Sequence, residues 1–188
     1  MAIIMGIDVS TTTIGWCILN YTRGQKPKII SHSFYKPSKK GNLFERLDQT
    51  RKDIRQVVEK YNPDYIAIED LIKFMKGKSS ATTIINLSVF NRMIGLMAYD
   101  FLGRPPDLFN VMSIRHGIRR EVGEKKLPAK EELPQHISKL LGIEYPWIKD
   151  KKGKIKVESY DVSDAMCVAY YCSLMLESGK INESSRSI

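Results

Sequence analysis

Residues 2–21 read AIIMGIDVSTTTIGWCILNY, two apolar runs joined by a short polar turn. Runs of this length between turn residues predict two strands, and residues 27–35, PKIISHSFY, predict a third strand after the turn signal NYTRGQKP. Three strands in succession favour an antiparallel meander. Residues 64–70, DYIAIED, form an apolar run with acidic ends, which is typical of a central strand buried on both faces.

Helical and strand-like segments alternate along the rest of the chain. An apolar face at helical spacing predicts a helix at 43–61, and Asn62-Pro63 ends it. Further on we expect a helix at 80–102 that is apolar around most of its circumference, a strand at 107–113, a short helix plus loop at 114–126, a short helix at 129–141 kinked or broken by Pro134, and an amphipathic helix at 161–177. This order predicts an α/β fold, with a mixed five-stranded sheet flanked by helices in one domain over residues 1–178, and a polar tail at 179–188.

Composition limits the function before any motif is considered. The chain has 188 residues, 43% of them hydrophobic, which is enough for one domain with its own core. Its net charge of +9 favours a polyanionic partner, nucleic acid ahead of an anionic membrane surface. No stretch approaches the roughly 18 apolar residues of a spanning helix. Three cysteines without a CxxC pair predict a reducing compartment, with no disulfide or zinc site, and hence a cytoplasmic protein without a membrane partner.

Four carboxylates stand at the ends of predicted elements. Asp8 and Glu69 close two apolar strands, where an ionised group needs a positive partner and no lysine or arginine is adjacent. Asp161 and Asp164 are three residues apart and share one helix face. Oxygen ligands alone suit Mg²⁺ or Mn²⁺, and such a cluster can hold two ions roughly 3.5–4 Å apart for phosphodiester hydrolysis. Taken singly, each carboxylate has a structural alternative, such as an N-cap for Asp161.

The segments GIDVSTTTIGWCIL, YIAIED and SYDVSDAMCVAYYC resemble, in order and spacing, the three acidic motifs of RuvC-type Holliday junction resolvases. The resemblance implies a ribonuclease H-like fold and a homodimer that makes paired nicks in four-way DNA junctions with Mg²⁺ or Mn²⁺, without a nucleotide cofactor. It implies that Asp8, Glu69, Asp161 and Asp164 are the catalytic metal ligands. Ser10 stands where the turn of the family has glycine.

The resemblance extends more weakly to other residues. It implies that Lys130 lies near the catalytic site, that Arg119 contacts DNA, and that Phe74 contacts or stacks on a base at the junction. The alternative for Phe74 is packing beneath its own loop. Basic residues near these motifs are further candidates for DNA contact: Lys76, Lys78, Lys151, Lys152 and Lys154. The alternative for the lysine run at 149–156 is a solvated loop. Asp70 follows Glu69 on a strand and is expected to face the opposite way.

Two rival classes remain open. GIDVSTTTIGW also resembles the first phosphate-binding hairpin of actin-like ATPases and sugar kinases, although 188 residues supply only one of their two lobes. A monomeric RNA-processing nuclease of the same fold is the second alternative. The apolar helix at 80–102 favours a two-fold dimer, and Phe90→Asp or Met97→Asp is expected to give monomers or poorly folded protein. The compact chain suits a bacterial or phage-infected cell.

Overall fold

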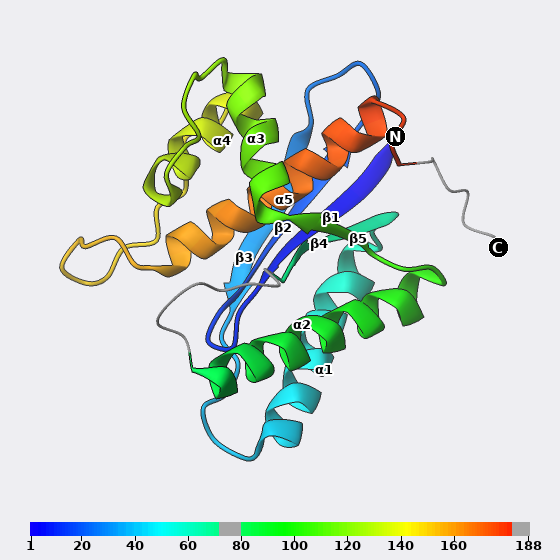
Figure 1. The fold of residues 1–188 in the computed structure, drawn as a ribbon, viewed down its shortest axis with the longest axis vertical. Helices are drawn as coiled ribbons and strands as arrows, with labels where there is room; N and C mark the ends of the chain where they lie inside the picture. Colours follow the sequence, from blue (N-terminus) through cyan, green and yellow to red (C-terminus); the bar gives the residue numbers. More distant parts are fainter. Residues whose placement is uncertain (72–79, 182–188) are drawn as a thin grey trace.

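The computed structural model describes residues 1–71 and 80–181. Its centre is a five-stranded sheet in the order β3-β2-β1-β4-β5 (Figure 1). The first three strands pair antiparallel, whereas β4 and β5 add to β1 in parallel. The strands are β1 (Ala2–Val9), β2 (Ile14–Tyr21), β3 (Lys28–Tyr35), β4 (Tyr65–Asp70) and β5 (Asp107–Asn110). The predicted meander and the mixed sheet are therefore confirmed.

Helices cover both faces of this sheet (Figure 1). On one face lie α1 (Leu43–Tyr61) and α2 (Ala81–Leu102). On the other lie α3 (Val111–Val122), α4 (Leu133–Leu141) and α5 (Glu158–Glu177), with the short 3₁₀ turn η1 (Lys130–Glu132) before α4. No helix in the described part of the chain is long and apolar enough to cross a membrane.

Strand alternation decides which layer each acidic residue faces. On β1, Met5 and Ile7 belong to the core under α1 and α2, whereas Ile4 belongs to the core under α5. Asp8 shares the side of Ile4, because successive residues of a strand point to opposite faces. By the same rule Glu69 faces α5 and Asp70 faces the α2 layer. Asp70 there pairs with Arg92 of α2, Nη2 to Oδ1 at 3.0 Å, as the sequence predicted for its orientation.

Two glycines allow α5 to lie directly on the sheet. A Cβ atom at Gly6 would come within 2.5 Å of the Ala169 backbone nitrogen, and one at Gly15 would overlap the carbonyl of Asp161. The beginning of α5 is therefore pressed against β1 and β2. Its other sides are covered by α3 and α4, so almost all of α5 is buried rather than amphipathic as expected.

Three element boundaries differ from the sequence prediction. The strand at 107–113 ends at Asn110, because the Asn110 side chain accepts a hydrogen bond from the Met112 amide at 2.8 Å and begins α3 there. Helix α5 begins at Glu158, so Asp161 lies in its first turn and is not its cap. Pro134 stands in the first turn of α4, where a missing N–H costs nothing, and does not kink a longer helix.

The apolar helix α2 is only partly covered. Phe90 and Met97 are buried against the sheet core, so of the two expected effects of an aspartate at either position, poor folding is the one that their burial supports, and neither side chain is open to a partner. The large apolar side chains that α2 exposes are Ile85, Leu96 and Tyr99. Leu96 follows Ile85 by three helical turns, and Tyr99 lies one turn further, so the three share one stripe.

Candidate active site

Three carboxylates converge where β1 ends beside the first turns of α5. One oxygen each from Asp8, Asp161 and Asp164 lies within 4.8 Å of the others. Glu69 ends the neighbouring strand, in register with Asp8 because Ile7 pairs with Ile68. Asp8 and Glu69 line one pocket. The structure thus brings together the four carboxylates that the sequence singled out, from three separate elements.

The turn after Asp8 closes without glycine. The Ser10 hydroxyl accepts hydrogen bonds from the Thr13 amide at 2.9 Å and the Thr12 amide at 3.2 Å, and it donates to the Thr13 carbonyl at 2.7 Å. Thr13 is buried and its side chain hydrogen-bonds Asp161. The Ser10 side chain therefore closes this turn by its own hydrogen bonds.

Burial and mutual repulsion raise the pKa values of the cluster. The pKa of Asp8 is well above its usual range because of burial, followed by repulsion from Asp164, Glu69 and Asp161. Burial and then Asp164 raise the pKa of Glu69 to about 7. Burial also raises the pKa values of Asp161 and Asp164, against the attraction of Lys130. So much buried negative charge needs a compensating cation.

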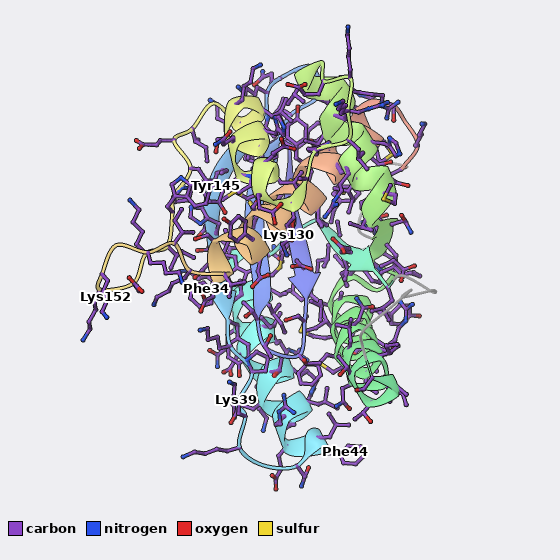
Figure 2. All side chains as sticks on the ribbon, turned by 60° about the vertical axis from the view of Figure 1, so that its left-hand side comes forward. Phe34, Lys39, Phe44, Lys130, Tyr145 and Lys152 are labelled. Atoms are coloured by element: carbon purple, nitrogen blue, oxygen red, sulfur yellow. The ribbon has the colours of Figure 1, made fainter. Side chains whose placement is uncertain are left out.

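Lys130 supplies one positive charge to this cluster. It stands on η1, and its Nζ lies 2.8 Å from Asp164 Oδ2 and 3.7 Å from Asp161 Oδ1. Burial alone would lower the pKa of Lys130, but the attraction of Asp164, Asp8 and Asp161 outweighs it and the pKa is raised. Figure 2 shows Lys130 over the first turns of α5.

Arg115 of α3 is a member of the site that sequence reasoning missed. Its charge lowers the pKa values of Glu69 and Asp164 against the effect of burial. Its Nε is buried and has no hydrogen-bond partner among the described residues. Arg119, the predicted residue, lies one turn further along α3. Arg115 acts on the acidic cluster, whereas the expected DNA contact of Arg119 stays a prediction.

Asn91 is a second missed residue. Its side-chain nitrogen donates to the Glu69 carbonyl at 2.9 Å and so ties α2 to the end of β4. The residue is 2% exposed and lines the same pocket as Asp8 and Glu69. Its Oδ1 is buried without a partner in the described residues. A polar residue inside an otherwise apolar helix was the signal that could have revealed it.

Six further residues are candidates for DNA contact, and three of them lie in the described part of the chain. Lys151, Lys152 and Lys154 are exposed on a hairpin that precedes α5. The candidates Phe74, Lys76 and Lys78 lie outside the described residues. All three cysteines are buried and free in the structure.

The donor set of this cluster fits a hard divalent cation. All four nearby acidic groups offer carboxylate oxygens, and three of them are already within reach of one another. A cation at this place would offset the repulsion that raises their pKa values.

Comparison with known proteins identifies the family. The sequence model of the family described as crossover junction endodeoxyribonuclease RuvC matches residues 4–100. The RuvC endonuclease of Fusobacterium nucleatum is 28% identical over 140 residues, which cover 74% of this chain and 68% of that protein. The one from Orientia tsutsugamushi strain Ikeda is 27% identical over 172 residues, covering 92% and 95%.

Solved structures agree with the sequence match. The structure of T. thermophilus RuvC in complex with Holliday junction substrate superposes with a TM-score of 0.71 at 16% identity, over 94% of this chain and 96% of that one. This likeness confirms the predicted ribonuclease H-like fold. Together with the family match over residues 4–100, it leads to one conclusion: the chain belongs to the crossover junction endodeoxyribonuclease RuvC family of nucleases.

Proposed function

We propose that this protein resolves four-way (Holliday) DNA junctions by paired, metal-dependent hydrolysis of phosphodiester bonds. The observation that carries the proposal is the convergence of Asp8, Asp161 and Asp164, beside Glu69, in a chain of this nuclease family. The site lies at strand ends, where a DNA backbone can approach it. The net charge of +9 favours such a polyanion.

The four carboxylates would hold two Mg²⁺ or Mn²⁺ ions. When bound, these ions activate a water molecule and stabilise the charge of the leaving oxygen. Asp8 and Glu69 present their oxygens from rigid strand ends, and Asp161 and Asp164 present theirs from a buried helix. Rigid supports of this kind hold ligands in the geometry that hydrolysis requires.

Lys130 and Arg115 would hold the charges of the site in place. Lys130 attracts Asp164 and Asp161, which keeps these carboxylates ionised and oriented. Arg115 does the same for Glu69 from the α3 side. Both cations would also offset the charge of the scissile phosphate as it enters the cluster.

The working unit would be a homodimer formed through the exposed stripe of α2. Ile85, Leu96 and Tyr99 are 60%, 63% and 48% exposed, and the exposed Arg92, which pairs with Asp70, lies between Ile85 and Leu96 on the same face. This face therefore offers three apolar side chains and one charged side chain to a partner. At Gly95, close to Leu96, a Cβ would meet nothing within 4 Å, so a partner helix can approach closely. A two-fold contact would present two sites to two symmetry-related strands.

The test is nicking of a four-way junction, a linear duplex and a structured RNA, each with Mg²⁺, with Ca²⁺ and without divalent ions. We expect paired nicks in the junction with Mg²⁺, and little hydrolysis with Ca²⁺ because its looser coordination fits two-ion geometry poorly. Asp8→Asn and Glu69→Gln should abolish nicking while the protein still folds and binds the junction.

Asp70→Asn is the matched control. Asp70 is adjacent to Glu69 but faces the α2 layer and pairs with Arg92. This variant should therefore keep nicking activity. Substantial metal-dependent nicking by Asp8→Asn would contradict the site assignment, and preferential cleavage of RNA would favour the RNA-processing alternative.

A further inference from the structure

Residues 148–156 form a hairpin that projects from the body of the protein just before α5. Its two sides pair antiparallel at Lys149 and Ile155, and the Lys156 amide donates to the Ile148 carbonyl at 2.8 Å. Figure 2 shows Lys152 at the far end of this projection. We call residues 148–156 the lysine hairpin.

The tip of the lysine hairpin is held in one conformation. Asp150 Oδ1 accepts hydrogen bonds from the Lys152 amide at 2.8 Å and the Lys154 amide at 2.9 Å. Gly153 donates its amide to the Asp150 carbonyl at 3.0 Å and adopts a φ of 80°, which favours glycine. A single carboxylate and one glycine thus fix the turn.

The base of the hairpin is fixed to the helix that carries two of the acidic residues. The buried Ser159 hydroxyl accepts a hydrogen bond from the Ile148 amide at 2.9 Å and donates to the Ile148 carbonyl at 3.2 Å. The Tyr145 hydroxyl donates to the Ser159 carbonyl. Since Ser159 stands two residues before Asp161 on α5, the hairpin has a defined position relative to the acidic cluster.

The charge of the hairpin is concentrated, and the acidic groups near it, Asp150 within the hairpin and Glu158, whose pKa Lys156 helps to lower, are fewer than its lysines. Residues 149–156 hold five lysines and one aspartate. All five lysines are exposed, and none forms an ion pair with any residue in the described part of the chain. A merely solvated loop needs no fixed turn and no buried anchor. Fixed charges, in contrast, bind a polyanion at a lower entropic cost than mobile ones.

We propose that the lysine hairpin is a preformed arm that binds the phosphate backbone of a duplex arm of the junction, beside the nicking site. This inference rests on the proposed function, which makes branched DNA the partner. Lys152 at the tip is four positions from Lys156, so the tip can extend at most roughly 13 Å beyond Lys156, the length of four fully extended residues. Two-stranded ribbons are known to lie along DNA grooves, and lysine acts there as a point charge on phosphate.

A pair of variants with equal charge tests the fixed geometry. Asp150→Asn keeps an oxygen that can accept the two amide hydrogen bonds, whereas Asp150→Ala removes it. Both remove the same negative charge. We expect Asp150→Ala to bind a long-armed junction about five- to tenfold more weakly than Asp150→Asn. Equal affinities would overturn the proposal of a preformed arm.

A second pair tests the location of the contact. The variant Lys151→Ala, Lys152→Ala and Lys154→Ala removes charge from the hairpin. Its control removes three exposed lysines at the opposite end of the sheet from Asp8: Lys28, Lys60 and Lys180. Each phosphate contact contributes about 0.9 to the log–log salt slope, so the hairpin variant should lose up to about 2.7. An equal loss in the control would refute the proposed location.

Varying the length of the junction arms distinguishes failure of this inference from failure of the proposed function. Wild type should lose affinity when the junction arms are cut too short to reach the hairpin, and the hairpin variant should not. All binding is measured without divalent ions, so that it does not depend on nicking. Failure of wild type to nick any junction would refute the proposed function. Insensitivity of wild-type affinity to arm length, with nicking intact, would refute the hairpin contact alone.

Discussion

The metal-free protein should lose stability as pH rises, because its acidic cluster is forced to ionise within the fold. Glu69 is the informative group. Burial and the repulsion of Asp164 raise its pKa from 4.5 to about 7. The folded state therefore holds this proton more tightly than the unfolded state does. The stabilisation is fully present below pH 4.5 and is lost as pH rises through 7.

The size of the effect follows from the two pKa values. Each unit of difference corresponds to about 1.4 kcal/mol, so the free energy of unfolding should fall by about 3 kcal/mol between pH 4 and pH 8 on account of Glu69. Asp8, whose pKa is also raised, acts in the same direction. A loss of this size is a large part of the stability of an ordinary domain.

Urea denaturation in EDTA, followed by circular dichroism across this pH range, measures the loss. Glu69→Gln cannot ionise, so its stability relative to wild type should improve by about 3 kcal/mol from pH 4 to pH 8. Asp70→Asn should show no such gain. Saturating Mg²⁺ at pH 8 should restore stability to wild type by mass action, by about 2.7 kcal/mol at a concentration 100 times Kd. A constant difference between wild type and Glu69→Gln across the range would refute the reasoning.

Two further predictions concern packing and assembly. Gly15→Ala places a methyl group against the Asp161 carbonyl. We therefore expect about 1–3 kcal/mol of destabilisation in thermal unfolding and at least a tenfold loss of nicking. Full activity would show that α5 can shift away from β2 without moving Asp161. Leu96→Asp should shift a dimer to monomer in sedimentation and abolish paired nicking. Phe44→Asp, at an even more exposed apolar position on α1, should leave the dimer intact. A monomeric wild type would refute the α2 contact.

The sequence predicts those features of the site that depend on one strand or one helix alone, such as the face on which a side chain lies. Alternation along β1 and β4 is enough to place Asp8 and Glu69 on one face, and the spacing of Asp161 and Asp164 is enough to place both on one side of a helix. Their convergence was predicted through the family resemblance; in the structure it arises because the parallel strands β1 and β4 end at the same edge of the sheet. The common edge of β1 and β4 follows from that topology.

What sequence reasoning missed depends on how helices pack. Arg115 acts on the cluster because α3 lies across α5, and no local pattern distinguishes it from Arg119. The same packing buries α5 on all sides, since Ile118 of α3 and Ile137 of α4 cover its outer face. The start of α5 was misplaced because Asp161 has the chemistry of a cap, while Glu158 and Ser159 already lie in the helix. Lys130 was found by resemblance alone, since η1 precedes α5 by more than twenty residues.

Helix α5 connects the acidic cluster to the lysine hairpin that we propose binds DNA. Gly15 brings the first turn of α5 onto the sheet and Gly6 brings its middle there, at Ala165 and Ala169, which sets Asp161 and Asp164 beside Asp8. The same first turn holds the base of the lysine hairpin through Ser159. A buried helix cannot tilt without opening cavities in both layers around it, and such cavities cost several kcal/mol. A duplex bound on the hairpin is therefore held at a fixed distance from the carboxylates, and the fold itself, rather than a moving part, would determine which phosphate reaches them.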